Sequence, residues 1–115
     1  MSKRSDKLLM LDMQEAIARI LEYTQGLDQW SFIQSQEKID SVVRNIQIIG
    51  EASNRTSLAL RNAHPEIEWP AIIGMRHRLV HDYFEIEEVI VWRVVSVKLP
   101  ILKEQVRAIL ESGIE

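Results

Sequence analysis

Apolar residues recur along the chain at intervals of three and four positions, which is the spacing of one face of an α-helix. Near the N-terminus this stripe consists of Leu9, Met13, Ala16 and Ile20. The spacing predicts a helix from about residue 6 to 25. Ser5 precedes this helix as the expected N-cap, and Gly26 follows as the C′ residue that would end it.

A short helix and a second long helix are predicted next. Asp28 is placed to cap a short helical turn that carries Trp30 and Phe32, and Ser35 is placed to cap the longer helix. The longer helix is expected to run to about residue 62. Its buried face is predicted to be Ile39, Val42, Val43, Ile46 and Ile49, while its other faces hold Lys38, Asp40, Arg44 and Asn45.

Two neighbouring residues stand out inside that helix. An interior glycine costs roughly 1 kcal/mol relative to alanine, so Gly50 is expected where another backbone approaches closely. Glu51 has two interpretations. It forms an exposed ion pair with Arg55, four residues later, or it turns toward a functional surface.

Two prolines separate these helices from a third. The residue before a proline is disfavoured in a helix, so His64-Pro65 and Trp69-Pro70 interrupt the chain, while Pro70 itself suits the first turn of a new helix. The buried side of this third helix is predicted to contain Ile72, Met75 and Leu79, and its other sides to carry His77, Arg78, His81 and Asp82.

The last segment combines strand-like composition with helical spacing. Residues 89–97 have strong β propensity, but their apolar pattern continues for five turns at intervals of three and four, which strands do not sustain. The stripe is Trp92, Val95, Leu99, Leu102, Val106 and Ile109. We expect a helix that begins near Glu85, Glu87 and Glu88, is kinked at Pro100 and ends at Ser112-Gly113.

These elements predict an all-α fold. Four main helices and a short extra helix would form a small up-down bundle, with residues 1–115 as one domain. The chain lacks cysteine, which excludes disulfides and thiol chemistry and fits a reducing cytoplasm, the expected location. Neither a signal peptide nor an apolar run of the ~20 residues needed to span a membrane is recognised. The net charge of −3 argues against broad coating of nucleic acid, so any RNA or DNA site must be local.

The chemistry is concentrated between Arg76 and Tyr83. This stretch holds two arginines, two of the three histidines and a tyrosine. It therefore supplies a permanent cation, a group that titrates near neutral pH and a hydroxyl, which together suit phosphate chemistry. On a straight helix, however, Arg76 and His81 lie about 140° apart around the axis. To meet one phosphate, the helix must loosen near His81, the arginine must curl across, or two chains must share the site. We favour a two-fold axis combined with loosening.

Each of these residues also has a purely structural interpretation. His81 would be a helix-terminal histidine stabilised by the helix dipole, Arg78 and Asp82 a solvated ion pair, and Tyr83 a core aromatic. A metal site is a further alternative, because His77 and His81 have the i, i+4 spacing of zinc or nickel ligands. Its third ligand would be Asp82, Glu51 or His64.

Arg76, His81 and Tyr83 form an R-x4-H-x-Y pattern. An R-x4-H pattern alone arises often by chance, but here it has four flanking features: Ile49-Gly50-Glu51-Ala52, His64-Pro65-Glu66-Ile67, Trp69 and the final helix with Trp92. In this order, the pattern and its flanks resemble the HepT-like branch of the HEPN superfamily.

This resemblance implies a metal-independent endoribonuclease without a cofactor, the toxin of a toxin–antitoxin pair, active as a homodimer with its cleft at the subunit interface. Arg76 and His81 would be catalytic, and His77, Arg78 and Glu51 would support catalysis or bind RNA. His77 stands where the family more often has Asn or Asp.

The implied partner is a minimal nucleotidyltransferase, the antitoxin, which would adenylylate Tyr83. The alternative function is that of a non-catalytic helical dimer that binds this partner or RNA. In that case Trp69, Trp92 and the apolar stripe of the last helix would form the interface.

Overall fold

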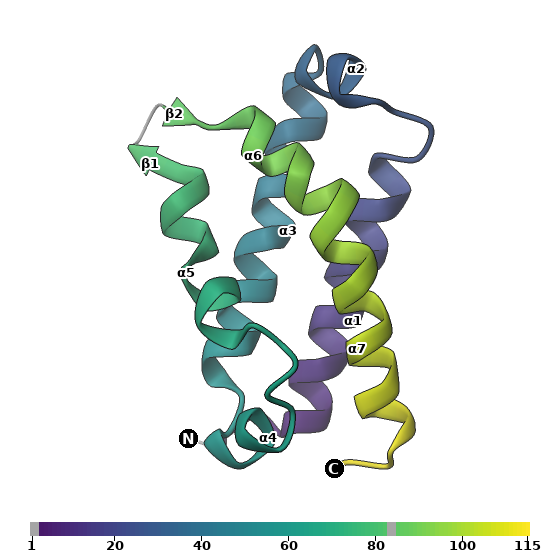
Figure 1. The fold of residues 1–115 in the computed structure, drawn as a ribbon, viewed down its shortest axis with the longest axis vertical. Coiled ribbons are helices and arrows are strands. Elements are labelled where there is room, and N and C mark those ends of the chain that lie inside the picture. Colours follow the sequence, from purple (N-terminus) through teal and green to yellow (C-terminus); the bar gives the residue numbers. More distant parts are fainter. Residues whose placement is uncertain (1–2, 83–84) are drawn as a thin grey trace.

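The computed structural model describes residues 3–82 and 85–115, which form a helical bundle with a small two-stranded addition (Figure 1). The long helices are α1 (Asp6–Tyr23), α3 (Gln36–Arg55), α5 (Trp69–Leu79) and a continuous run made of α6 (Glu88–Arg93), the π-helical turn η1 (Val94–Lys98) and α7 (Leu99–Glu111). Two short helices, α2 (Gln29–Ile33) and α4 (Leu58–Ala63), and the strands β1 (Val80–Asp82) and β2 (Glu85–Ile86) complete it. The all-α prediction is confirmed.

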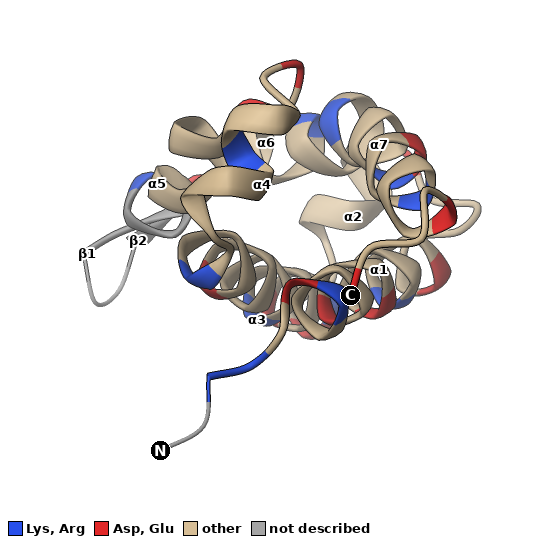
Figure 2. Cartoon of the chain, turned by 90° about the horizontal axis from the view of Figure 1, so that it is seen from below, with Lys and Arg blue, Asp and Glu red and all other residues tan. Residues whose placement is uncertain are grey.

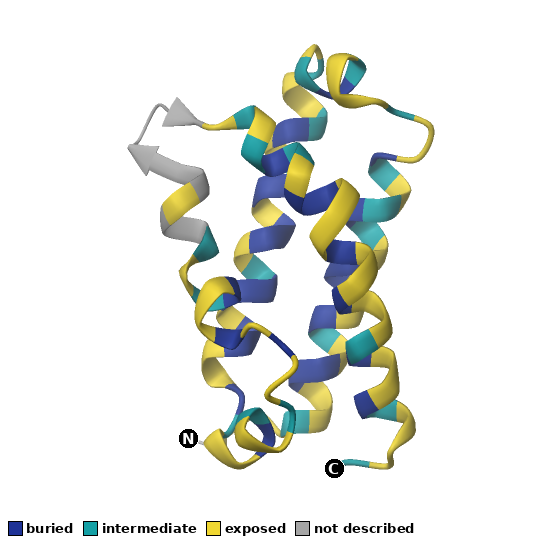
Figure 3. Ribbon diagram, viewed as in Figure 1, coloured by how far each residue is buried: buried dark blue, intermediate teal, exposed yellow. Residues whose placement is uncertain are grey.

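The four long helical segments alternate in direction, as expected of an up-down bundle (Figure 1). α3 packs against α1 on one side and α5 on the other, and α7 packs against α1. One cluster of buried apolar side chains fills the interior, and the outer faces are exposed (Figure 3). The predicted stripes of α1 and α3 belong to this cluster, as does Phe32, whose ring centroid lies 5.2 Å from that of Trp92. Acidic and basic residues are interspersed along the outer surfaces of α1, α3 and α7 (Figure 2).

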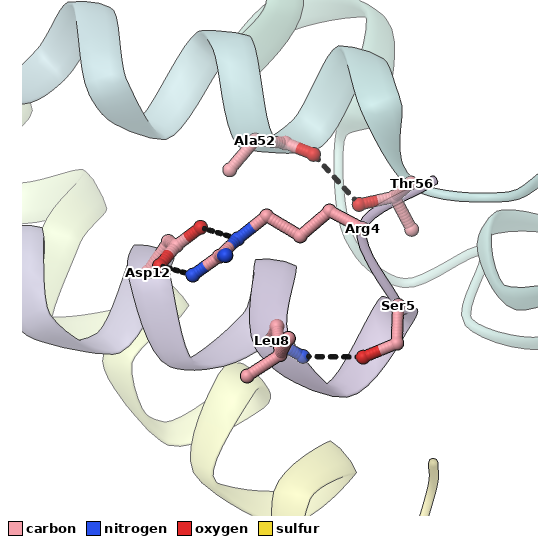
Figure 4. A network of polar contacts seen from close by, with 6 residues as sticks. All are labelled: Arg4, Ser5, Leu8, Asp12, Ala52 and Thr56. Atoms are coloured by element: carbon pink, nitrogen blue, oxygen red, sulfur yellow. Dashed lines mark hydrogen bonds and ion pairs between the residues drawn. The ribbon is translucent and has the colours of Figure 1, made fainter. Parts of the chain in front are cut away.

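The three predicted N-caps at the start of the chain are confirmed. The hydroxyl of Ser5 accepts the N–H of Leu8 at 3.2 Å (Figure 4). Asp28 and Ser31 form a capping box on α2, and Ser35 caps α3. α1 ends slightly earlier than predicted, with Thr24 as its C-cap, so Gly26, at φ +79°, lies two residues beyond the cap instead of at C′.

The N-terminal segment is held against α1 by a bidentate ion pair between Arg4 and Asp12. Nε and Nη2 of Arg4 lie 2.7 and 2.8 Å from the two carboxylate oxygens of Asp12 (Figure 4). The hydrogen bond and the charge of Asp12 raise the pKa of the Arg4 guanidinium.

The predicted extension of the second long helix to residue 62 is wrong. α3 ends at Arg55, and a separate helix, α4, follows after Thr56 and Ser57. Side chains stabilise this break: the hydroxyl of Thr56 donates to the carbonyl of Ala52 at 2.8 Å (Figure 4), and Ser57 caps α4. The carboxylate of Asp6 in α1 accepts both the N–H and the hydroxyl of Ser57, at 3.0 and 2.6 Å. The bundle therefore has two short helices instead of one.

The buried surface of α3 is wider than predicted, because α3 packs against helices on two sides. Asn45, predicted outside the buried face, is only 5% exposed, and its Nδ2 donates to the carbonyl of Ser41 at 2.8 Å. The close approach expected at Gly50 is confirmed. A Cβ atom there would lie 3.3 Å from the carbonyl oxygen of Ile72 and 3.7 Å from that of Ile73, both in α5.

The helical interpretation of the last segment is confirmed, including its end at Ser112 and Gly113, which has φ +83°. Its expected start is wrong for Glu85, which belongs to β2; the helix begins at Glu88, after Glu87. The irregularity expected from Pro100 takes the form of the π-helical turn that precedes it. There the N–H of Leu99 donates to the carbonyl of Val94, five residues earlier. Pro100 itself lies in the first turn of α7, where a missing N–H costs little. None of the described helices is both long and apolar enough to cross a membrane.

Candidate functional site

The helix that carries the motif, α5, begins as predicted. Trp69 is buried, and its indole N–H donates to the carbonyl of His64 at 3.0 Å, which ties the start of α5 to the preceding loop. Pro70 lies in the first turn of the helix. Farther along, Ile72 is buried beside Gly50 of α3. The position of α5 is therefore fixed at its start and along its middle.

The end of α5 divides the motif. Arg76, His77 and Arg78 belong to the helix, but the helix stops at Leu79 and His81 lies in β1. β1 pairs antiparallel with β2, with Val80 opposite Ile86. The backbone of residues 80–82 therefore pairs with β2 and does not continue the hydrogen bonding of the α5 helix. The loosening expected near His81 is present.

This end point overturns the helical placement of His81 and Asp82. His77 and His81 are not an i, i+4 pair of one helix, and neither are Arg78 and Asp82. The alternative of a zinc or nickel site was based on this i, i+4 spacing within one helix, and the structure does not support it. His64, its possible third ligand, is the C-cap of α4, with its Nδ1 3.4 Å from a carboxylate oxygen of Glu66. Within residues 3–82 and 85–115, no three metal-ligating side chains of described placement gather into a cluster.

Several of the candidate groups lie outside the described residues: Tyr83 altogether, and the side chains of Arg76, His77, His81 and Asp82. Their proposed roles stay predictions. The two remaining candidates, Arg78 and Glu51, are both exposed but line different hollows.

Arg78 lines the larger hollow, which we call the α5–α7 groove. It has a volume of about 620 Å³, within the range of roughly 300–1,000 Å³ that is typical of ligand sites. One wall is α5, the other is the α6–η1–α7 run, and the loop before α5 closes one end. Apolar side chains such as Met75, Ile90 and Ile101 line it together with three cations, Arg78, Arg93 and Lys98, and two acids, Glu66 and Glu68.

Glu51 lines a smaller hollow of about 400 Å³ on the surface between α1 and α3. Its other charged residues are Asp12, Arg44 and Arg55. Asp12 is already paired with Arg4. The structure therefore does not bring Glu51 and Arg78 into one hollow, and the two interpretations of Glu51 stay open.

Comparison with known proteins decides the family. Residues 13–109 match the family described as ribonuclease HepT-like. The chain belongs to this family.

HepT-like relatives match nearly the whole chain. "Probable ribonuclease HepT" of Thermococcus cleftensis is 36% identical over 101 residues, which is 88% of this chain and 92% of the relative. A protein of Methanocaldococcus jannaschii whose name describes it as an RNase is 32% identical over 109 residues, 95% of this chain and all of the relative. No solved structure gives a significant match.

The HepT-like motif was visible in the sequence, but the groove beside it was not. In the sequence, Arg93 and Lys98 lie between the apolar positions of the last helix, and nothing there marks them as site residues. They join Arg78 because α5 and the α6–η1–α7 run face each other across the groove and meet where α5 contacts α6, a tertiary relation that no local pattern encodes. The one available signal was Gly74, a second interior helix glycine, which also lines this groove.

Proposed function

We propose that the protein is a metal-independent endoribonuclease, the toxin of a toxin–antitoxin pair, and that it acts as a homodimer with its catalytic cleft at the subunit interface. The observation that carries this proposal is the R-x4-H-x-Y motif, which begins in α5, in a chain that matches the ribonuclease HepT-like family over residues 13–109. Relatives named as RNases support the substrate class.

RNA contains its own nucleophile, so the enzyme needs no metal to cleave it. The 2′-hydroxyl loses its proton and attacks the neighbouring phosphorus, and the bond from phosphorus to the 5′ oxygen breaks. Neutral His81 of one chain accepts the proton, and protonated His81 of the second chain gives a proton to the leaving oxygen. Each transfer typically contributes 10²- to 10⁴-fold to the rate. Arg76 holds the phosphate through its planar fork and stabilises the charge that develops in the transition state.

The remaining motif residues support this reaction. Tyr83 bonds a phosphate oxygen or orients His81, while His77 and Arg78 contact RNA near the reacting phosphate. Tyr83 is also the proposed point of control. A minimal nucleotidyltransferase, the antitoxin, attaches a nucleotide to its hydroxyl, which fills the cleft and repels RNA through its negative charge.

The end of α5 at Leu79 changes the reason for invoking two chains. Because His81 lies beyond the end of the helix, the angle of about 140°, which assumes a straight helix through both residues, no longer applies. The proposal of a shared cleft therefore rests on the need for two histidines in opposite protonation states, because each chain contributes only one His81.

Cleavage in excess chelator tests the enzyme. Purified protein should cut RNA, and His81→Ala should abolish cutting while the fold and the dimer persist. Arg44→Gln is a matched surface control, because Arg44 is exposed and lines the separate hollow between α1 and α3. If unmodified, dimeric wild-type protein binds RNA but leaves it intact, the protein is the non-catalytic dimer and the enzyme proposal fails.

Mixing wild-type chains with His81→Ala chains tests the shared cleft. A mixed dimer keeps one His81, so it lacks either the proton acceptor or the proton donor of the proposed reaction. Wild-type chains co-refolded with a large excess of His81→Ala chains should therefore lose nearly all of their cleavage activity per wild-type chain. Cleavage that stays proportional to the amount of wild-type chain would mean that each chain carries a complete site.

The adenylylation step is tested by mass spectrometry. Incubation with the nucleotidyltransferase and ATP should add one nucleotide to Tyr83 and lower RNA cleavage, and Tyr83→Phe should remain unmodified. Inhibition of the Tyr83→Phe variant to the same degree would show that the partner acts without modifying this residue.

A further inference from the structure

The α5–α7 groove is a feature of the fold that the motif does not explain. Two of its cations, Arg78 and Arg93, have no ion pair or hydrogen bond with any other side chain in the described part of the chain. The third, Lys98, lies 3.9 Å from a carboxylate oxygen of Glu68. Because α5 and the α6–η1–α7 run are antiparallel, the acids Glu66 and Glu68 lie beside the start of α5, and the two unpaired arginines lie toward its end. The groove is therefore positive at the end where the motif begins.

Gly74 is a second, independent sign that something enters the groove. It lies inside α5, where a glycine costs roughly 1 kcal/mol relative to alanine. At Gly50 the packing of the chain explains the glycine, but a Cβ at Gly74 would meet no atom within 4 Å. Nothing within the described chain requires a glycine here. A ligand whose backbone comes close to the helix would require one.

We propose that the α5–α7 groove binds the single strand of RNA next to the bond that is cut, with Arg93 and Arg78 holding consecutive phosphates and Gly74 allowing the strand to approach α5. This inference rests on the proposed ribonuclease function and names its substrate-binding surface.

The lining favours a single strand over a duplex. Met75, Ile90 and Ile101 present apolar surface between the charged groups, and unpaired bases can contact such surface, whereas a duplex offers mainly phosphates and 2′-hydroxyls. Two arginines are few for duplex binding, which is dominated by phosphate neutralisation. In a chain of net charge −3, they also confine RNA to this groove.

The groove ends next to the motif. Arg78 is the penultimate residue of α5, and His81 follows three residues later in β1. An RNA strand bound at Arg78 therefore reaches the C-terminal end of α5, which His81 follows in the sequence. Arg93 is an RNA-binding residue on the opposite wall and takes no part in proton transfer, so its loss should change RNA affinity and not the chemical step.

Fluorescence anisotropy with a short, labelled 2′-O-methyl RNA tests the groove, because this RNA lacks the attacking hydroxyl and is not cut. Arg93→Gln should raise the Kd for RNA about fivefold to tenfold. It should also reduce the steepness of the plot of log K against log salt concentration by about 0.7, which is the value for the loss of one phosphate contact with a single strand. Arg44→Gln is the matched control and should leave both quantities unchanged. In cleavage assays Arg93→Gln should raise KM and leave kcat within about twofold.

Gly74→Leu provides the second variant, because Gly74 lines the groove and a Cβ at this position meets no atom within 4 Å, so the added side chain should occupy groove space. It should bind RNA at least tenfold more weakly while its Tm is not lowered. If the wild type binds and cuts RNA but Arg93→Gln and Gly74→Leu behave like Arg44→Gln, the groove proposal alone is overturned. If Gly74→Leu converts a dimer to a monomer, a second chain covers the groove, which also overturns it. If the wild type neither binds nor cuts RNA, the ribonuclease proposal itself fails.

Discussion

The two interior glycines of α3 and α5 form a matched pair for testing the packing. Gly50 and Gly74 occupy the same kind of helical position, but their surroundings differ. A Cβ at Gly50 would lie 3.3 Å from the carbonyl oxygen of Ile72, whereas a Cβ at Gly74 would have open space within 4 Å. Replacing each by alanine adds the same methyl group and the same helix propensity. Any difference between the two variants therefore reports the close approach of α3 and α5.

The expected magnitudes follow from these contacts. Gly74→Ala should stabilise the protein by about 0.5–1 kcal/mol, because alanine loses less backbone entropy in a helix. At Gly50 the same gain is opposed by a contact tighter than ordinary van der Waals distance, so α5 must move by a few tenths of an ångström. Such overpacking typically costs about 1–3 kcal/mol. Gly50→Ala should be neutral or destabilising, and Gly50→Leu clearly destabilising.

Urea and thermal unfolding followed by circular dichroism measure the difference. A change of 1 kcal/mol corresponds to a Tm shift of about 4 °C in a chain of this size. All variants must be compared at one protein concentration, because dimerisation would make Tm depend on it. If Gly50→Ala raises Tm as much as Gly74→Ala does, α3 and α5 are not so close that a methyl group forces them apart. The argument that Gly50 positions α5 would then be wrong.

Two further predictions concern the polar contacts of the fold. Asp6→Ala removes the carboxylate that accepts the N–H and hydroxyl of Ser57, and should lower the free energy of unfolding by about 1–3 kcal/mol in urea titrations. Asp12→Ala, which removes only the partly exposed partner of the exposed Arg4, should cost less, and an equal loss would contradict this ranking. The backbone N–H and hydroxyl of Ser31 lower the pKa of Asp28 below its ordinary value of 3.8, so its contribution to stability is present above that pH and disappears as pH falls through the lower, folded-state value. Asp28→Asn should therefore flatten the loss of stability in acid, and an unchanged pH profile from neutral pH to pH 3 would show that this carboxylate does not contribute.

The sequence predicted the long helices because their stability comes from amphipathic stripes that local spacing reveals. It failed where a distant residue decides the local structure. The apolar pattern continues beyond Arg55, but the break at Thr56 and Ser57 is stabilised by Asp6, 51 residues away from Ser57 in the chain. A helix-period pattern cannot show this competition. The same limit hid Asn45, whose burial depends on α3 having neighbours on two sides.

For the motif, too, the sequence indicated the residues but not their arrangement in space. Its residue types and order were sufficient to indicate the family, which the match over residues 13–109 confirms. Its geometry was not predictable in full, because α5 ends at Leu79 where β1 finds a pairing partner in β2. The relation between Arg78 and Arg93, 15 positions apart, likewise depends on how two antiparallel helices pack.

α5 connects these observations, since it meets the rest of the chain and the proposed RNA through different parts of its surface. The carbonyl groups of Ile72 and Ile73 approach Gly50 so closely that even a methyl group at this position would require a shift of a few tenths of an ångström. Gly74, directly after them, opens into the α5–α7 groove. A site carried on a packed helix is held more accurately than one on a loop. The contact at Gly50 therefore sets the distance between α3 and α5, and with it the position of Arg78 and of the helix end from which the segment of His81 continues. Small changes at Gly50 should thus affect cleavage as well as stability, although Gly50 itself does not line the groove.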